Sequence, residues 1–166
     1  MKKIFILIFV FFITVAVSAQ IKLPSVIGNH MVLQQNSIVK IWGWCNQQED
    51  IELIASWDNK KYITNIKADK SWMFEIKTPA AGGPFNIQLK SAKEKIILED
   101  VLIGEVWLCS GQSNMAMPMS GKTNQPILNG DSIISTAKNF KLRLFKAEET
   151  MADEPQKNVK GVWKQS

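Results

Sequence analysis

Residues 100–115 read DVLIGEVWLCSGQSNM, and this stretch decides which fold the sequence predicts. Its apolar part, Val101 to Cys109, is interrupted only by Gly104 and Glu105, which is typical of a strand that is buried on both faces. A small and polar turn, SGQSN at residues 110–114, follows at once. A buried strand that ends in such a turn indicates the first strand of a parallel α/β sheet, with a site at its carboxyl end.

Downstream of this turn the sequence predicts one short helix and one further strand. Asp131 can cap a helix from Ser132 to Lys138, and the alternation at residues 141–146 predicts a strand. Strand, helix and strand make the start of a parallel α/β unit. Beyond it only a polar stretch and the segment 159–163 remain, which is too little to cover both faces of a parallel sheet. We therefore expect residues 100–166 to be an incomplete α/β domain.

Upstream of the same stretch, short alternating runs bounded by turn residues have the spacing of an all-β sandwich. The clearest run places Trp72, Phe74 and Ile76 on one face of a strand, a pattern with period two. Proline and glycine at residues 79–84 then end this run. We expect residues 20–99 to form a β-sandwich module, with strands in the runs 39–44, 51–55, 62–66, 72–77 and 85–90.

Residues 1–19 predict an export signal. Lys2 and Lys3 give a positive start, residues 4–17 are apolar, and Val17-Ser18-Ala19 resembles a small-residue cleavage site. The apolar run is short for a bilayer span, so the alternative, a transmembrane anchor, is disfavoured. We expect cleavage after Ala19 and a mature chain that is secreted or periplasmic and is not held in the membrane.

The formal net charge of +5 does not predict a nucleic-acid partner. The basic excess is almost all lysine, with Arg143 as the only arginine, and the lysines are interleaved with acidic residues along the predicted strands. Nucleic-acid binding is favoured by a clustered stripe of arginine and lysine, which this sequence lacks.

Two distant cysteines and one histidine cannot assemble a metal cluster, so neither a metal nor a cofactor is predicted. After export, a single disulfide between Cys45 and Cys109 is arithmetically open. Each cysteine lies beside tryptophan-rich apolar sequence, however, which favours a buried free cysteine in both places.

Ser113 is the candidate for chemistry because it follows the predicted buried strand in a tight turn with glycine nearby. In α/β proteins that position holds a side chain outward at the carboxyl end of the sheet. The lipase-type elbow G-x-S-x-G is not matched, since Met115 stands at the place of the second glycine. On this local pattern alone, a turn or capping serine is the commoner interpretation.

The whole run at residues 100–115 resembles the first block of the sialic-acid-specific O-acetylesterase family, within the wider group of SGNH-type esterases. NHMVLQQ at 29–35 and IWGW at 41–44 are similar to the β module that precedes the catalytic domain in that family, and residues 141–145 resemble its second catalytic-domain strand. The resemblance covers the chain from about residue 23 to residue 163. It implies a β-sandwich module followed by the start of an SGNH hydrolase-like α/β domain with a parallel sheet.

The resemblance implies acyl transfer, in which the Ser113 hydroxyl attacks an acetyl ester on a sugar and water then hydrolyses the acetyl-enzyme. The implied partner is an acetylated carbohydrate, with no cofactor. By the same analogy the Ser113 backbone N–H donates to the oxyanion. Gly111 and Gln112 would shape the turn and Asn114 would hold the loop, and for these three a structural role is as well supported as a functional one.

The sequence departs from the family in what should activate the serine. Family members supply a histidine, with an acidic partner, from a motif near the carboxyl end of the catalytic domain, and that motif is absent. The single histidine, His30, lies in the β module beside an apolar segment and is interpreted as a surface or structural residue. We therefore expect an amino-terminal esterase fragment that is inactive alone. The alternatives are a non-catalytic glycan-binding β-sandwich and a purely structural β module.

Overall fold

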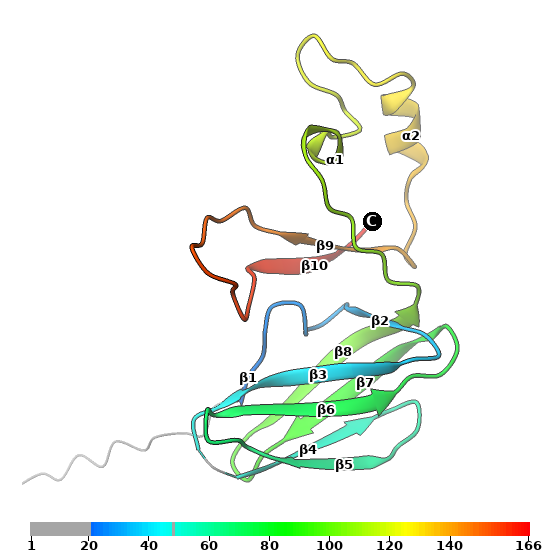
Figure 1. Cartoon of the computed structure of the whole chain (residues 1–166). Helices are drawn as coiled ribbons and strands as arrows, with labels where there is room; N and C mark the ends of the chain where they lie inside the picture. The colour runs from blue at the N-terminus through cyan, green and yellow to red at the C-terminus, as the bar shows by residue number, and fades with distance from the viewer. Residues whose placement is uncertain (1–20, 48) are drawn as a thin grey trace, which may run out of the picture.

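The computed structural model describes residues 21–47 and 49–166, so the predicted signal at 1–19 lies outside the described residues. Within them the chain forms ten strands and two short helices (Figure 1). Eight of the strands build a β module that ends at Gly104, and the rest of the chain lies above it in the view of Figure 1. The elements in chain order are β1 Ile21–Lys22, β2 Val32–Gln34, β3 Ile38–Cys45, β4 Asp50–Ala55, β5 Lys61–Asn65, β6 Ser71–Lys77, β7 Gly82–Lys90, β8 Lys95–Gly104, α1 Ser113–Ala116, α2 Gly130–Thr136, β9 Arg143–Ala147 and β10 Gly161–Gln165.

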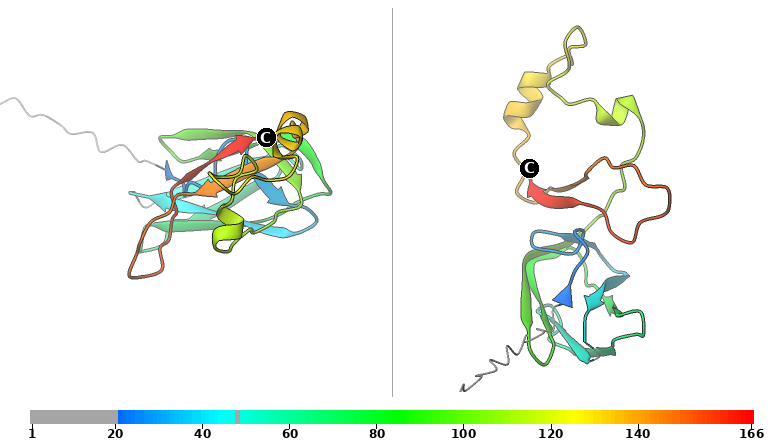
Figure 2. Two further views of the ribbon diagram at one scale, coloured as in Figure 1. Left: turned by 90° about the horizontal axis from the view of Figure 1, so that it is seen from above. Right: turned by 90° about the vertical axis from the view of Figure 1, so that its left-hand side faces the viewer.

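Two sheets make up the β module. β1, β3 and β6 form a three-stranded antiparallel sheet, and the other five strands form a sheet in the order β2-β8-β7-β4-β5. All pairs in the larger sheet are antiparallel except β2 with β8, which is parallel. The larger sheet curls as a half-barrel (Figure 2), so the predicted β-sandwich is not confirmed. The chain is built of mixed sheets with few helices.

The core of the module is drawn from both sheets. Trp72, Phe74 and Ile76 of β6 are buried together, as their alternation predicts, and they share one cluster with Leu53 of β4 and Leu89 of β7. Full burial of a large apolar side chain contributes about 1.5–3 kcal/mol to stability. The alternating strands are therefore held together by a single hydrophobic core.

β8 takes the place of the strand that the sequence predicts at residues 101–109. It runs from Lys95 to Gly104, so it crosses the expected boundary between residues 99 and 100 and belongs to the β module. Its last residues pair with β7 on one side and with β2 on the other. The apolar start of the predicted strand is therefore used in the core of the module instead of in an α/β sheet.

Beyond β8 the apolar run leaves the core. Residues 105–112 form no strand, and the side chains of Trp107 and Leu108 are 82% and 95% exposed. A strand that is buried on both faces needs neighbouring strands and covering helices, which no described segment supplies here. Cys109 is exposed as well, so the prediction of a buried cysteine is wrong there and right for Cys45; both are free thiols.

The predicted second strand and helix are present in altered form. β9 pairs with β10 in an antiparallel hairpin, with Phe145 opposite Trp163, so it does not join a parallel sheet. α2 begins at Gly130, and Asn129, in a left-handed conformation, occupies the N-cap position that the sequence predicts for Asp131. The parallel α/β sheet is thus not formed in the described part of the chain.

The β9–β10 hairpin rests on the β module. Trp163 packs against the core cluster, and its indole N–H donates a hydrogen bond to the Val26 carbonyl over 2.9 Å. The Ser25 backbone N–H donates to the side-chain oxygen of Asn158 over 3.0 Å. In the right-hand view of Figure 2 the hairpin lies between the module and the two helices. Residues 105–142, called here the projecting segment, carry both helices away from the module.

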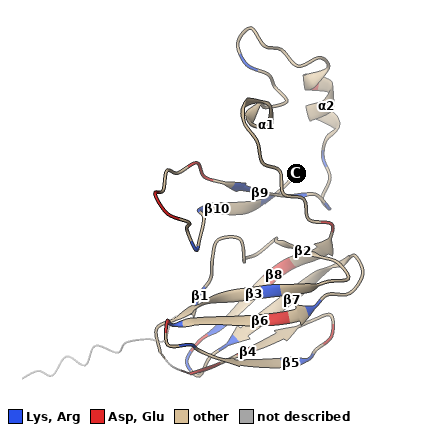
Figure 3. Ribbon diagram, viewed as in Figure 1, with Lys and Arg blue, Asp and Glu red and all other residues tan. Residues whose placement is uncertain are grey.

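Charges of both signs are mixed over the strands of the module, and the projecting segment carries only a few (Figure 3). No helix in residues 21–47 or 49–166 is both long and apolar enough to span a lipid bilayer.

Candidate active site

Ser113 lies on the surface at the start of α1. It is the first residue of this four-residue helix and is exposed to solvent. The Gln112 carbonyl accepts hydrogen bonds from the backbone N–H groups of Met115 and Ala116, at 3.0 and 3.1 Å, and these bonds form the helical turn. The outward serine at a tight turn is therefore present, although it stands well beyond the end of β8 and not directly at the tip of a strand.

The residues flanking Ser113 contribute differently to this turn. A Cβ atom at Gly111 would lie 2.6 Å from Cγ of Met115, so a larger residue there would push the methionine side chain aside. Gln112 acts through its backbone carbonyl. The side chain of Asn114 is exposed and bonds to none of the described residues.

Two backbone donors beside the Ser113 hydroxyl are unpaired. The N–H groups of Ser113 and Asn114 lie in the first turn of α1 and donate to no described residue. First-turn N–H groups lack an acceptor within their own helix, and groups of this kind can stabilise an oxyanion. The turn therefore presents a hydroxyl and adjacent backbone donors on an exposed surface.

His30 is bonded elsewhere. Its Nδ1–H donates to Oδ2 of Asp100 over 2.7 Å, which is the contact that a catalytic histidine makes with its acidic partner. The pair stands where β2 and β8 meet, whereas α1 lies away from the β module, beyond the β9–β10 hairpin (Figure 1). His30 thus has a structural partner, and none of the described side chains bonds to the Ser113 hydroxyl.

Asp100 collects three donors on one carboxylate oxygen. Besides His30, Arg143 donates from Nη2 over 2.9 Å and Gln165 from Nε2 over 3.2 Å, all to Oδ2. The bond from His30 does most to hold the pKa of Asp100 below its ordinary value. Partial burial opposes this shift, and the charge of Arg143 supports it. Asp100 therefore stays ionised and joins β8 to the loop before β2 and to both strands of the hairpin.

Arg143 carries the one sequence signal that could have revealed this cluster. It is the only arginine in a chain whose other basic residues are all lysine. Arginine suits buried ion pairs better than lysine because its planar guanidinium holds several donors in fixed directions. In the structure its side chain is only 4% exposed, and a second nitrogen, Nη1, donates to the Phe140 carbonyl.

Glu105 makes a second cluster, directly after β8. Its two carboxylate oxygens accept hydrogen bonds from the side-chain amides of Gln34 and Gln35, at 3.1 and 2.6 Å. The Val106 backbone N–H donates in turn to the Gln34 side chain over 3.0 Å. The bonds from Gln35 and then Gln34 lower the pKa of Glu105 from its ordinary value. The first residues of the projecting segment are therefore fixed to β2 and the residue that follows it.

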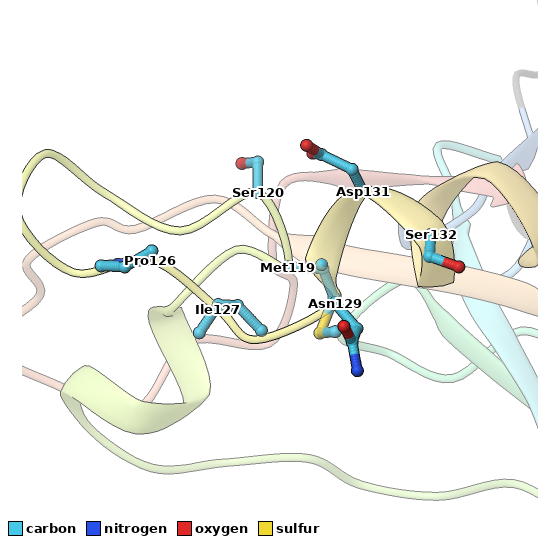
Figure 4. A pocket seen from close by; sticks show the side chains of 8 residues that line it. Met119, Ser120, Pro126, Ile127, Asn129, Asp131 and Ser132 are labelled. Carbon is cyan, nitrogen blue, oxygen red and sulfur yellow. The ribbon is translucent and has the colours of Figure 1, made fainter.

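A hollow lies beside α2 and does not include Ser113 (Figure 4). A Cβ atom at Gly130 would lie 2.3 Å from the Met119 carbonyl oxygen, so the loop packs closely against the start of this helix. No group of three or more His, Cys, Asp or Glu side chains in the described residues is arranged to hold a metal ion. The residues that line the hollow are Met119, Ser120, Pro126, Ile127, Asn129, Gly130, Asp131 and Ser132.

Comparison with known proteins gives relatives of one kind, although no family model matches the chain. The sialate O-acetylesterase of Rattus norvegicus is 34% identical over 159 residues, which cover 85% of this chain and 27% of that protein. The sialate O-acetylesterase of Mus musculus is 32% identical over 150 residues, which cover 80% of this chain and 26% of that protein. The chain thus spans about a quarter of the length of these relatives.

A solved structure supports the same relationship. The crystal structure of a carbohydrate acetylesterase from Xanthomonas citri matches with a TM-score of 0.79 and 28% sequence identity. The match covers 88% of this chain and 32% of that one. The mixed sheets and the segments around them are therefore arranged as in part of a carbohydrate acetylesterase.

Proposed function

We propose, from the premise that this chain is a homologue of the sialate O-acetylesterases, that it forms part of a carbohydrate O-acetylesterase in which Ser113 is the nucleophile. The observation that carries the proposal is the exposed Ser113 hydroxyl beside unpaired backbone N–H groups in the first turn of α1. The substrate class is an acetylated sugar.

The chemistry is acyl transfer in two steps. Oγ of Ser113 bonds to the acetyl carbonyl carbon while a base takes the hydroxyl proton, and the negative charge collects on the carbonyl oxygen. The unpaired N–H groups of Ser113 and Asn114 would stabilise that charge. The bond to the sugar oxygen then breaks, the sugar leaves as an alcohol after taking up a proton, and water releases acetate from the acetyl-serine.

The chain by itself should show no appreciable esterase activity. A serine hydroxyl is a weak nucleophile unless a neighbouring base removes its proton. The only histidine of the sequence is His30, and its Nδ1–H is engaged with Asp100 in the β module, away from α1 (Figure 1). Within this chain, no histidine is therefore placed to act as the base for Ser113.

A chimaeric enzyme tests the proposal directly. In the Xanthomonas citri acetylesterase, the third of the chain that matches would be replaced by residues 21–166 of this protein. We expect the chimaera to release acetate from an acetylated chromogenic sugar, and Ser113→Ala to abolish that release. The isolated chain should be inactive with either residue at position 113.

Two controls make the result decisive. Ser110→Ala changes a neighbouring exposed serine of the same turn and should leave turnover close to that of the parent chimaera. Circular dichroism of each variant checks that the fold is kept. Turnover that survives Ser113→Ala, or turnover by the isolated chain that Ser113→Ala removes, would show that the assignment is wrong.

A further inference from the structure

The projecting segment, which holds Ser113, begins and ends beside the same carboxylate. Asp100 lies in β8 shortly before the segment starts, and Arg143, the first residue of β9, follows its last residue. The 2.9 Å contact between Oδ2 of Asp100 and Nη2 of Arg143 joins residues that are 43 positions apart. It therefore closes the chain into a loop that contains Ser113.

The returning end of the loop is held in a largely buried contact. The Arg143 side chain is 4% exposed, and its Nη1 donates to the carbonyl of Phe140, so it also fixes the last residues of the segment. Gln165 reaches the same oxygen of Asp100 from the neighbouring strand β10. A buried guanidinium without a counter-charge is costly, so this arrangement depends on the ionised carboxylate of Asp100.

The departing end is held separately by Glu105. Both of its carboxylate oxygens are engaged by side-chain amides, from Gln34 in β2 and from Gln35 next to it. The side-chain oxygen of Gln35 also accepts a hydrogen bond from the Ala81 backbone N–H over 2.9 Å. This bond connects the residues around Glu105 to the chain just before β7. The direction in which the chain leaves β8 is therefore set by side-chain contacts, since no strand pairing continues beyond Gly104.

We infer that Asp100 and Glu105 are positioning residues, which fix the two ends of the projecting segment and thereby set where Ser113 stands relative to the β module. Fixing both ends of a long loop removes many of the conformations that it could otherwise adopt. The role of Ser113 as the nucleophile rests on the proposed function, whereas the fixing of the two ends of the segment does not.

Cys109 provides a reporter inside the loop. It lies between Glu105 and Ser113 and is exposed, whereas the only other cysteine, Cys45, is buried. A nitroxide attached to the thiol of Cys109 in the full chain would report local motion through its electron paramagnetic resonance spectrum. Mass spectrometry of the labelled chain would verify that Cys45 is unmodified.

Three variants of the labelled chain test the inference at neutral pH. We expect Asp100→Asn and Glu105→Gln each to increase the mobile component of the spectrum. Glu75→Gln is the matched control, because Glu75 makes an exposed ion pair with Lys40 in the three-stranded sheet, at 3.8 Å, and has no contact with the loop. Its spectrum should match that of the parent chain.

The outcomes separate positioning from general stability and from catalysis. Circular dichroism should remain that of the parent in both test variants, because the strands of the module keep their core. If Asp100→Asn does not fold, Gln165→Leu removes only one exposed donor from the cluster and should still raise mobility to a smaller extent. The inference would be overturned if the folded variants gave the electron paramagnetic resonance spectrum of the parent. It would also be overturned if Glu75→Gln increased the mobile component as much as the test variants do. None of these readouts depends on whether Ser113 is the nucleophile, which the chimaera tests independently.

Discussion

At Asp100, three donors bond to one carboxylate oxygen, and these bonds make the stability of the fold depend on pH. His30 approaches from the loop before β2, Arg143 from β9 and Gln165 from β10. His30 and Arg143 are the titratable and charged groups that face the carboxylate, and the bond from His30 does most to lower its pKa. The folded chain therefore binds a proton at Asp100 less readily than the unfolded chain does.

The pH dependence of stability follows from this difference. An ionised Asp100 stabilises the fold fully at pH values above the ordinary aspartate pKa of about 3.9, and the contribution is lost as the pH falls through the lowered value. We expect the free energy of unfolding in urea to be higher for the parent than for Asp100→Asn at neutral pH. The gap should shrink below about pH 4, where the parent carboxyl also becomes neutral. A gap that stays constant down to about pH 2 would contradict this prediction.

Single residues were predictable where their role is local. The tight turn around Ser113 could be predicted from the small residues that form it, and the contact of Gly111 with Met115 lies within that same turn. The Asp100–Arg143 contact could not be predicted in the same way, because it joins positions 43 residues apart. The single arginine marks one partner, but nothing near it in the sequence identifies the carboxylate that it meets. The fold itself brings the two side chains together.

At the scale of elements, the strands with complete partners within the chain are those that the sequence predicts well. β6 and β7 alternate because one face of each packs on the core and the other faces solvent. The continuous apolar run at residues 101–109 carries no such signal, since it is divided between the core and an exposed stretch. The parallel pairing of β2 with β8 joins segments that are distant in the sequence, so no local sequence pattern predicts it.

β3 passes so close to its neighbours that one of its residues has no room for a side chain. A Cβ atom at Gly43 would lie 2.3 Å from the Lys22 carbonyl oxygen in β1 and 2.6 Å from Cζ2 of Trp72 in β6. Gly43→Ala must therefore push β1 or Trp72 away, and we expect it to destabilise the module by about 1–3 kcal/mol.

Urea unfolding, followed by tryptophan fluorescence, measures this cost. Gly28→Ala is the matched control, because nothing lies within 4 Å of the Cβ atom that it would add. Its effect should stay within about 0.5 kcal/mol. An equal effect of both substitutions would mean that β3 does not pack against β1 and Trp72 in the way described.

Across the whole molecule, burial is distributed unevenly. Residues 21–104 enclose a common core, whereas in the projecting segment Gly130 alone among the described residues is buried. The presence of large apolar residues could not predict this difference, because Trp107, Leu108 and Phe140 of the segment are exposed although they are apolar. Burial depends on which surfaces are available to cover them, and the β module supplies a surface for the hairpin through Trp163 and little for the helices.

Chymotrypsin, which cuts after large apolar residues, should distinguish the two parts of the chain. Trp107, Leu108, Leu128 and Phe140 are 82%, 95%, 87% and 74% exposed, while Trp72 and Phe74 are buried at 1% and 4%. We expect early cuts at the four exposed sites and a resistant module that ends near residue 107, as mass spectrometry of timed samples would record. Segments with few buried contacts open at little free-energy cost, which makes them accessible to proteases.

The hairpin should behave differently from the segment that precedes it. Because Trp163 packs on the module core and Arg143 bonds to Asp100, residues 141–166 should remain bound to the module after the segment has been cut, and the pieces should elute together in size-exclusion chromatography. In Asp100→Asn the buried guanidinium loses its counter-charge, so the hairpin should be released more readily. A chain that resists cleavage throughout residues 105–142 would show instead that the projecting segment is as compact as the module.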